Sequence, residues 1–177
     1  MNALAVVAAA RAIGVSAARA AAGLAGLAAA AGRCAQSTVR LKSGAEIVIL
    51  DESYNANPTS MAAALALLGH LKPRGEGRRI AVLGQMLELG PEGPALHAGL
   101  AEPLLAAGAN ALYVAGALMD HLWEKTPLAV RAGRAADARA LAPAILEALR
   151  DGDIVMVKGS NASKVSEIVA ALKSAAV

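Results

Sequence analysis

The stretch that decides the fold is residues 47–58, which read Ile47-Val48-Ile49-Leu50-Asp51-Glu52-Ser53-Tyr54-Asn55-Ala56-Asn57-Pro58. Its first four residues are apolar and mostly β-branched, which favours a buried strand. Pro58 suits the first position of a helix, and Asn57 before it suits the N-cap. Two acids, a phenol and two amides therefore share one strand-to-helix turn. Ligands bind at such turns in open α/β sheets, although an ordinary polar loop is the alternative.

Apolar strands and amphipathic helices alternate from residue 46 to the end of the chain. We expect strands at 38–41, 46–50, 79–83, 111–114 and 153–157, with Val130 in a further edge strand. We expect helices after Pro58, at 94–107 with a kink at Pro103, and at 118–123, 135–149 and 163–173. This order predicts an α/β fold with a Rossmann-like, mostly parallel sheet and helices on both faces.

The first 32 residues are rich in alanine, contain Arg11 and Arg19, and include no acidic residue. An arginine-bearing, acid-poor N-terminal segment is typical of a transit peptide, and that interpretation stays open. A membrane span fits less well, because the uncharged stretch 20–32 is short for a bilayer. A third interpretation is that the segment forms two short soluble helices.

The two helices are expected at residues 2–13 and 16–27. Gly14 suits the end of the first helix, and Ser16 suits the N-cap of the second. The apolar residues of these helices are sparse, which is unusual for a unit that folds by itself.

The composition excludes several classes of protein. Among the 177 residues, 56% are hydrophobic and 18% are charged, which excludes disorder. A single cysteine, Cys34, excludes a disulfide framework and a cysteine-based zinc site, and it suits a reducing cytoplasm. A net charge of +3 and 2% aromatic residues argue against nucleic-acid binding. The histidines, His70, His97 and His121, lack metal-ligand spacing, and we interpret them as surface or capping residues.

A second polar motif, Lys158-Gly159-Ser160, follows the last expected strand and precedes the last expected helix. Free backbone N–H groups at a helix N-terminus favour an anion, and a lysine adds a full positive charge. The alternative is a solvated lysine beside a helix cap. The chain has no GxxxxGK[ST] phosphate loop, so it does not cradle a triphosphate in that way by itself.

Several of these stretches resemble one known family. Residues 51–65, DESYNANPTSMAAAL, are similar to the signature of MurF ligases, which add D-alanyl-D-alanine to UDP-N-acetylmuramoyl-tripeptide in bacterial cell-wall synthesis. AVLGQMLELG at 81–90, VMVKGSN at 155–161 and Gly32-Arg33 resemble further motifs of the same family, in the expected order. The chain departs from the family at Gln85, where aspartate is usual, and at Ala162 after the last motif.

The resemblance covers essentially the whole chain but only about the last third of a family member. It implies that residues 1–32 are the helical tail of a central ATP-binding domain plus a hinge, and that residues 33–177 are the C-terminal α/β domain of a Mur ligase. ATP and Mg would be bound mainly by the central domain, which this chain lacks. The isolated chain would then be inactive.

The implied reaction begins with phosphorylation of the tripeptide carboxylate to an acyl phosphate, which the amine of D-alanyl-D-alanine then attacks. The implied partners are these two substrates and the central domain of the same enzyme, in the cytoplasm, without nucleic acid or membrane. The residues implied on the nucleotide side are Arg33 for the phosphates, Asp51 or Glu52 for the ribose, and Tyr54, Asn55 and Asn57 beside them. Lys158 and Ser160 are implied at the acyl phosphate or the dipeptide, and no metal-binding residue is implied.

Two alternatives to this assignment remain. One is a Mur ligase that adds a different amino acid. The other is a free-standing α/β module that kept the ligand-binding turn without a catalytic partner domain. A phosphate loop encoded upstream would distinguish the ligase from the module.

Overall fold

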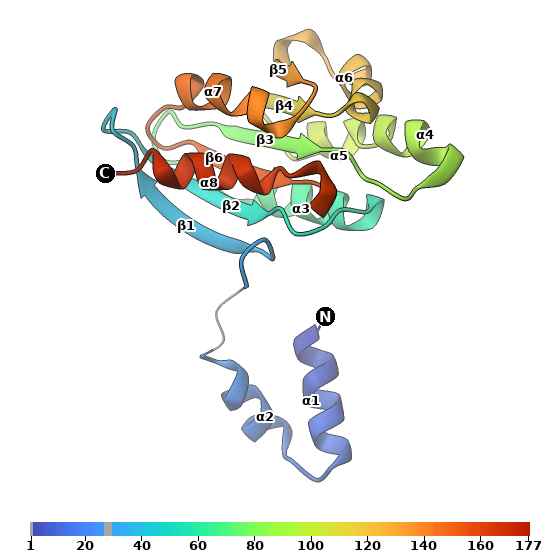
Figure 1. The fold of residues 1–177 in the computed structure, drawn as a ribbon. Coiled ribbons are helices and arrows are strands. Elements are labelled where there is room, and N and C mark those ends of the chain that lie inside the picture. Colours follow the sequence, from blue (N-terminus) through green and yellow to red (C-terminus); the bar gives the residue numbers. More distant parts are fainter. Residues whose placement is uncertain (1, 27–29) are drawn as a thin grey trace.

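The computed structural model describes residues 2–26 and 30–177. Its main body is built on a six-stranded sheet with the order β1-β2-β6-β3-β4-β5 (Figure 1). The strands are β1 (Ala35–Arg40), β2 (Glu46–Glu52), β3 (Arg79–Gly84), β4 (Ala111–Ala115), β5 (Arg131–Ala135) and β6 (Ile154–Lys158). The neighbouring strands are parallel except β1, which runs antiparallel to β2. The predicted mostly parallel sheet is confirmed.

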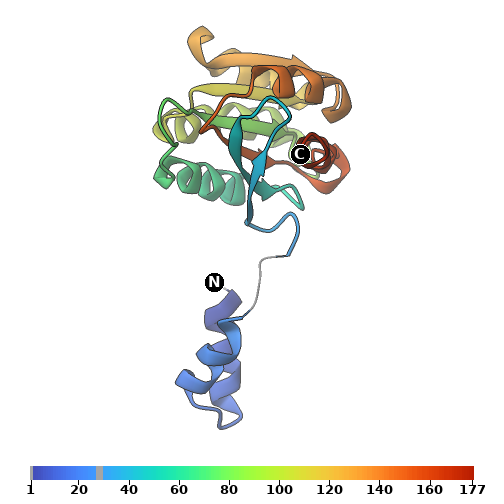
Figure 2. The same cartoon turned by 90° about the vertical axis from the view of Figure 1, so that its left-hand side faces the viewer.

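Helices cover both faces of this sheet, as predicted (Figure 2). One face carries α3 (Pro58–His70), α4 (Gly93–Ala98), α5 (Ala101–Ala106) and α6 (Asp120–Lys125). The other face carries α7 (Ala138–Ala148) and α8 (Ser166–Ser174). Short 3-10 turns complete the body: η1 (Gly90–Glu92), η2 (Ala117–Met119), η3 (Leu128–Val130) and η4 (Asn161–Ser163).

The central strands are apolar except at their ends, because both of their faces are buried. In β6, Val155 and Val157 join the core beneath α7 and α8, whereas Ile154 and Met156 join the core beneath α3 and α5. Successive side chains of a strand point to opposite faces, so a strand covered by helices on both sides needs a continuous apolar run. This is why the runs at β2, β3 and β6 could be recognised in the sequence.

The helix predicted at 94–107 with a kink at Pro103 is wrong in detail. The chain forms two helices, α4 and α5, that are separated at Gly99 and Leu100. Pro103 has no N–H to donate to the carbonyl of Gly99, and its ring crowds the residue four positions earlier. The break therefore falls one turn before the proline, at Gly99, and glycine is itself unfavourable in a helix interior.

Three other predictions for element boundaries differ from the structure. Val130 lies in η3 and not in a strand, although the edge strand β5 begins at the next residue. The helix predicted from residue 135 begins at Ala138, because the Asp137 carboxylate caps it and accepts from Ala140 N at 2.9 Å. The last helix, expected from residue 163, begins at Ser166 after η4.

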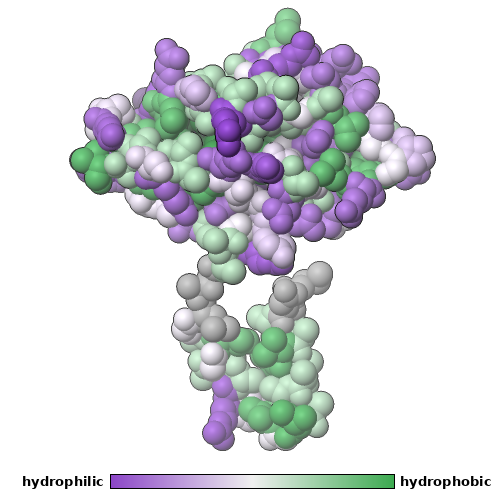
Figure 3. Space-filling model, viewed as in Figure 1, coloured by the Kyte–Doolittle hydropathy of each residue, from purple (hydrophilic) through white to green (hydrophobic). Residues whose placement is uncertain are grey.

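The N-terminal segment forms the predicted pair of helices, α1 (Asn2–Ala12) and α2 (Ala17–Leu24). Gly14 has a φ of +86°, and the Ser16 hydroxyl caps α2 by accepting from Arg19 N at 3.3 Å. Figure 1 shows this hairpin apart from the sheet, and its visible face in Figure 3 is mostly apolar. Leu4 and Ile13 are 76% and 81% exposed.

The second helix is predicted to run to residue 27, but α2 ends at Leu24, with Ala25 as its C-cap. The predicted hinge lies outside the described residues at 28–29. The division into domains at residues 32 and 33 stays a prediction. Among the described residues, no helix has both the length and the hydropathy needed to cross a membrane.

Candidate functional site

The loops after β2, β3 and β6 meet at one edge of the sheet but leave it toward different faces. The chain continues from β2 to α3 and from β3 to α4 on one face, whereas β6 leads to α8 on the other. Because β6 lies between β2 and β3, this is a topological switch point, where doubly wound sheets bind ligands. A cleft of about 390 Å³ lies here, lined by residues 55–57, 87–89 and 160–162, and we call it the motif cleft.

Two glycines let the loops after β3 and β6 approach each other closely. A Cβ atom on Gly159 would lie 3.0 Å from Gly84 Cα and 2.5 Å from Ser163 Oγ. A Cβ atom on Gly84 would lie 2.5 Å from Val165 Cγ1. A side chain at either position would therefore push the two loops apart.

Ser160 connects these two loops by hydrogen bonds. Its N–H donates to the Gln85 carbonyl at 3.1 Å, and its hydroxyl oxygen accepts from Leu87 N at 2.9 Å. The hydroxyl hydrogen has no acceptor among the described residues, and Ser160 lines the motif cleft. The hydroxyl is therefore placed to donate to a ligand, which is compatible with the predicted role at the reacting end. That role stays a prediction.

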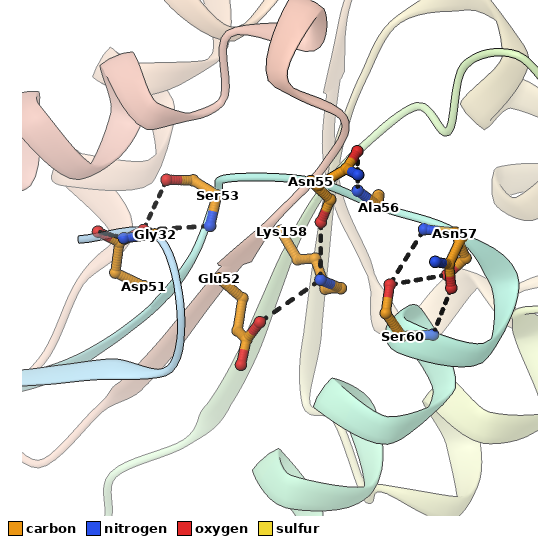
Figure 4. A network of polar contacts seen from close by, with 9 residues as sticks. All are labelled: Gly32, Asp51, Glu52, Ser53, Asn55, Ala56, Asn57, Ser60 and Lys158. Carbon is orange, nitrogen blue, oxygen red and sulfur yellow. Dashed lines mark hydrogen bonds and ion pairs between the residues drawn. The ribbon is translucent and has the colours of Figure 1, made fainter. Parts of the chain in front are cut away.

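Lys158 is only 2% exposed and uses its ammonium inside the protein (Figure 4). Its Nζ donates to the Asn55 carbonyl at 2.9 Å and lies 3.5 Å from Glu52 Oε2. The parallel register places Glu52 and Lys158 side by side at the ends of β2 and β6. In this conformation the lysine fixes the turn after β2, and one of its three N–H donors is left for another contact.

Asp51 is also buried, and both of its carboxylate oxygens are engaged (Figure 4). Oδ1 accepts from the N–H and hydroxyl of Ser53 at 3.1 and 2.6 Å, and Oδ2 accepts from Gly32 N at 3.0 Å. The Gly32 carbonyl in turn accepts from Tyr54 N at 3.1 Å. Asp51 therefore fastens the segment before β1 to the turn after β2.

Arg33 lies beside the same turn. Its guanidinium stands 3.9 Å from the centroid of the Tyr54 ring, a cation–π contact, and Tyr54 is 48% exposed.

Cys34, the next residue after Arg33, has a left-handed backbone conformation, with a φ of +62°. Cys34 is an exposed residue, but partial burial of its thiol, followed by the nearby carboxylate of Glu52, raises the pKa of the thiol to about 11. No sequence motif marks Cys34 as a neighbour of this site.

The two asparagines of the turn serve the backbone. Asn57 is the predicted N-cap of α3: its Oδ1 accepts from Ser60 N at 2.8 Å, and Ser60 Oγ accepts from Asn57 N at 3.0 Å. Asn55 Oδ1 accepts from Ala56 N at 2.9 Å, which leaves its amide NH₂ free to donate. Both asparagines line the motif cleft, and their predicted contacts with a nucleotide stay predictions.

The interpretation of His97 as a surface or capping residue is wrong. Its ring is fully buried and accepts from Met86 N at 2.9 Å, in the loop between β3 and η1. No local sequence signal marks this contact, because eleven residues separate the pair.

Gln85 stands where the family usually has aspartate. Its side-chain oxygen lies 3.5 Å from Leu118 N, toward η2, and Gln85 is not among the residues lining the cleft.

No cluster of three or more potential metal ligands occurs among residues 2–26 and 30–177. A nucleotide, in contrast, is compatible with the groups around Tyr54. The aromatic ring is half exposed beside an arginine, and Asp51 Oδ2 accepts one hydrogen bond and has a further lone pair for a hydroxyl. A pocket of about 390 Å³ adjoins these groups and includes Gly32, Asp51 and Tyr54 in its lining.

Comparison with known proteins places this site in a family. Residues 32–161 match the family model described as "Mur ligase, glutamate ligase domain". The chain belongs to the Mur ligase family. Among curated relatives, this Mur ligase chain is 32% identical to the UDP-N-acetylmuramoyl-tripeptide–D-alanyl-D-alanine ligase of Escherichia coli. That alignment covers 97% of the chain and 36% of the relative, so the chain spans about a third of the relative's length.

Solved structures support the same fold. A crystal structure of MurF from Acinetobacter baumannii superposes with a TM-score of 0.79 at 25% identity, over 98% of this Mur ligase chain and 37% of that one. MurF from Thermotoga maritima, in complex with ADP, superposes with a TM-score of 0.77 over 96% of this chain and 36% of that one. Its 21% identity supports the fold alone.

Proposed function

We propose that this chain is the C-terminal part of an ATP-dependent ligase that joins D-alanyl-D-alanine to UDP-N-acetylmuramoyl-tripeptide. The ligase would act in the cytoplasm, in the synthesis of peptidoglycan precursors. The curated relative from Escherichia coli that carries this activity in its name aligns with 97% of the chain. The preceding domains of the enzyme would be its main partner and would supply most of the ATP and Mg site.

The observation that carries the proposal is the motif cleft. Three separate stretches that resemble family motifs line one cleft at the switch point of the sheet. Its polar lining consists of the amides of Asn55, Asn57 and Asn161, the Ser160 hydroxyl and one charged side chain, Glu88. None of the described lining residues is cationic, so the cleft suits a small peptide better than a chain of phosphates.

We assign the nucleotide to the neighbouring surface formed by Arg33, Asp51 and Tyr54. ATP, when bound, supplies the phosphoryl group that activates the tripeptide carboxylate. Arg33 would move from Tyr54 to the phosphates, and Asp51 Oδ2 would accept from a ribose hydroxyl with its free lone pair. Glu52 would act through Lys158, with which it forms the ion pair below the turn.

We assign the reacting end to the side of the cleft where β6 ends. The Ser160 hydroxyl would donate to the dipeptide or to the acyl phosphate. Lys158 would position the Asn55 carbonyl and place its remaining N–H donor toward the same region. These residues orient and neutralise reactants without forming a covalent bond, a mode of catalysis that depends on rigid placement.

The test is a ligation assay on a hybrid enzyme in which this chain follows the preceding domains of the Escherichia coli relative. We expect ATP-dependent product with D-alanyl-D-alanine and little with single amino acids. The chain alone should release no phosphate from ATP in the presence of both substrates. A preference for a single amino acid would favour another Mur ligase activity, and an inactive but folded hybrid would favour the binding module.

A further inference from the structure

One wall of the motif cleft is the loop of residues 85–89, which follows β3. Two consecutive N–H groups of this loop point inward: Met86 N–H donates to His97 Nε2 at 2.9 Å, and Leu87 N–H donates to Ser160 Oγ at 2.9 Å. The next residue, Glu88, has a φ of +63°. A non-glycine residue in this region is strained, so surrounding contacts must hold it there. The two inward hydrogen bonds are the contacts that directly precede it.

The hydrogen bonds of His97 define its protonation. The ring is fully buried, and its Nδ1 lies 2.6 Å from the Gly93 carbonyl, which can only accept. Nδ1 therefore carries the hydrogen, and Nε2, which accepts from Met86, carries none. A protonated ring would place an N–H at Nε2 against the N–H of Met86, and the hydrogen bond would be lost.

We propose that His97 is a positioning residue of the motif cleft, whose neutral ring holds Met86 and so fixes the wall at residues 87–89 for the incoming amine substrate. The nature of that substrate rests on the proposed function. The contact between His97 and the loop rests on the geometry alone. His97 itself does not line the cleft and acts through the loop.

The same geometry makes the cleft sensitive to pH. Burial lowers the pKa of His97 below that of an ordinary histidine, against the raising effect of its bond to Gly93. α6 packs against α4 and carries Asp120, His121, Glu124 and Lys125, and η1 carries Glu92. Among these groups and Glu88 of the loop, His121 is the one whose charge acts on the ring, and it lowers the pKa further. The cleft should keep its shape through neutral pH and lose it as the pH falls through this lowered value.

The contact is tested first by NMR on the 177-residue chain. We expect His97 to be the Nδ1–H tautomer and to have a pKa below that of an ordinary histidine. His97→Ala should accelerate hydrogen exchange of the Met86 amide about tenfold or more, since it leaves a buried donor without a partner. His97→Gln, whose amide oxygen can accept the same bond, should restore most of the protection. His70→Ala, at an exposed histidine at the end of α3, is the matched control.

The consequence for the ligand is tested by titrating the same variants with D-alanyl-D-alanine and following the amides of residues 85–89 and 160–162. We expect the apparent Kd for the dipeptide to be about tenfold higher in His97→Ala than in the wild type, and close to the wild-type value in His97→Gln. At acidic pH the apparent Kd should rise in the wild type but not in His97→Gln. If His97→Ala binds the dipeptide as tightly as the wild type does, the proposed role of His97 is overturned. If a large excess of the dipeptide does not shift these amide signals in the wild type, the proposed substrate of the cleft is overturned. The hydrogen-exchange data would still decide whether His97 holds Met86.

Discussion

Replacing Lys158 by methionine would remove the ammonium that connects the ends of β2 and β6 and would keep most of the buried side-chain volume. Two groups would lose a partner, namely the Asn55 carbonyl at 2.9 Å and the Glu52 carboxylate at 3.5 Å. The side chains of Lys158 and Glu52 are 3% and 18% exposed, so water compensates the carboxylate only in part. The change therefore probes whether this lysine organises the turn after β2.

The expected cost follows from the two contacts. At 3.5 Å, an effective dielectric constant of about 20 gives an attraction of about 5 kcal/mol, most of which is offset by desolvation of the two charges. About 1 kcal/mol should remain for the ion pair. The shorter bond to Asn55 leaves a carbonyl without its donor, at about 1–2 kcal/mol. We expect Lys158→Met to lower the free energy of unfolding by about 2–3 kcal/mol, and Glu52→Gln by about 1 kcal/mol or less.

The assay is urea unfolding of the 177-residue chain with the two single variants, the double variant and Lys173→Met as a control at an exposed lysine. The double variant should cost less than the sum of the single ones by about 1 kcal/mol, the coupling of the pair. Loss of less than about 0.5 kcal/mol in Lys158→Met would refute the reasoning. So would a larger loss in Glu52→Gln than in Lys158→Met.

Three further predictions concern other parts of the chain. Gly32→Ala should speed hydrogen exchange at the Tyr54 amide, because the new Cβ would lie 2.9 Å from Tyr54 Cβ. Gly44→Ala, which is also at positive φ but in open space, should leave this exchange rate unchanged. Arg78→Ala should cost about 3 kcal/mol in chemical denaturation, because the fully buried Asp153 carboxylate would lose its guanidinium partner and keep only the backbone N–H groups of residues 78 and 150. An equal loss in Arg74→Ala, at an exposed pair, would contradict this. With a pKa of about 11, the Cys34 thiol should react with iodoacetamide at pH 8 more slowly than a free cysteine. Glu52→Gln should speed the reaction, and equal rates in the wild type and Glu52→Gln would contradict the influence of Glu52 on the thiol.

Features set by neighbouring residues could be predicted from the sequence. The apolar run before Asp51, the Asn57 cap and Pro58 together place a strand, a turn and a helix, and each is present. The same holds for the strand that ends at Lys158 and for Ser16 as an N-cap. Parallel strands deliver their carboxyl ends to one edge, so the meeting of the three motifs could also be expected.

Contacts that depend on strand order could not be predicted in this way. The pair of Glu52 and Lys158 exists because β6 inserts between β2 and β3, and no local pattern specifies that order. Asp51 reaches Gly32 nineteen residues away because the hairpin of β1 and β2 folds back on itself. His97 reaches Met86 only because α4 turns back under the loop, after the short turn η1.

The central claim, that the motif cleft receives the reacting groups of the ligase, is tested most directly by filling the cleft in the hybrid enzyme. Ala162 is an exposed residue of its lining, and Ala136 is an exposed residue lining a pocket of about 380 Å³ at the ends of β4 and β5. The measurement is the steady-state rate of ligation for Ala162→Trp and Ala136→Trp, with both proteins checked for folding. We predict a loss of about a hundredfold or more for Ala162→Trp and a near-normal rate for Ala136→Trp. A near-normal rate for Ala162→Trp would contradict the claim.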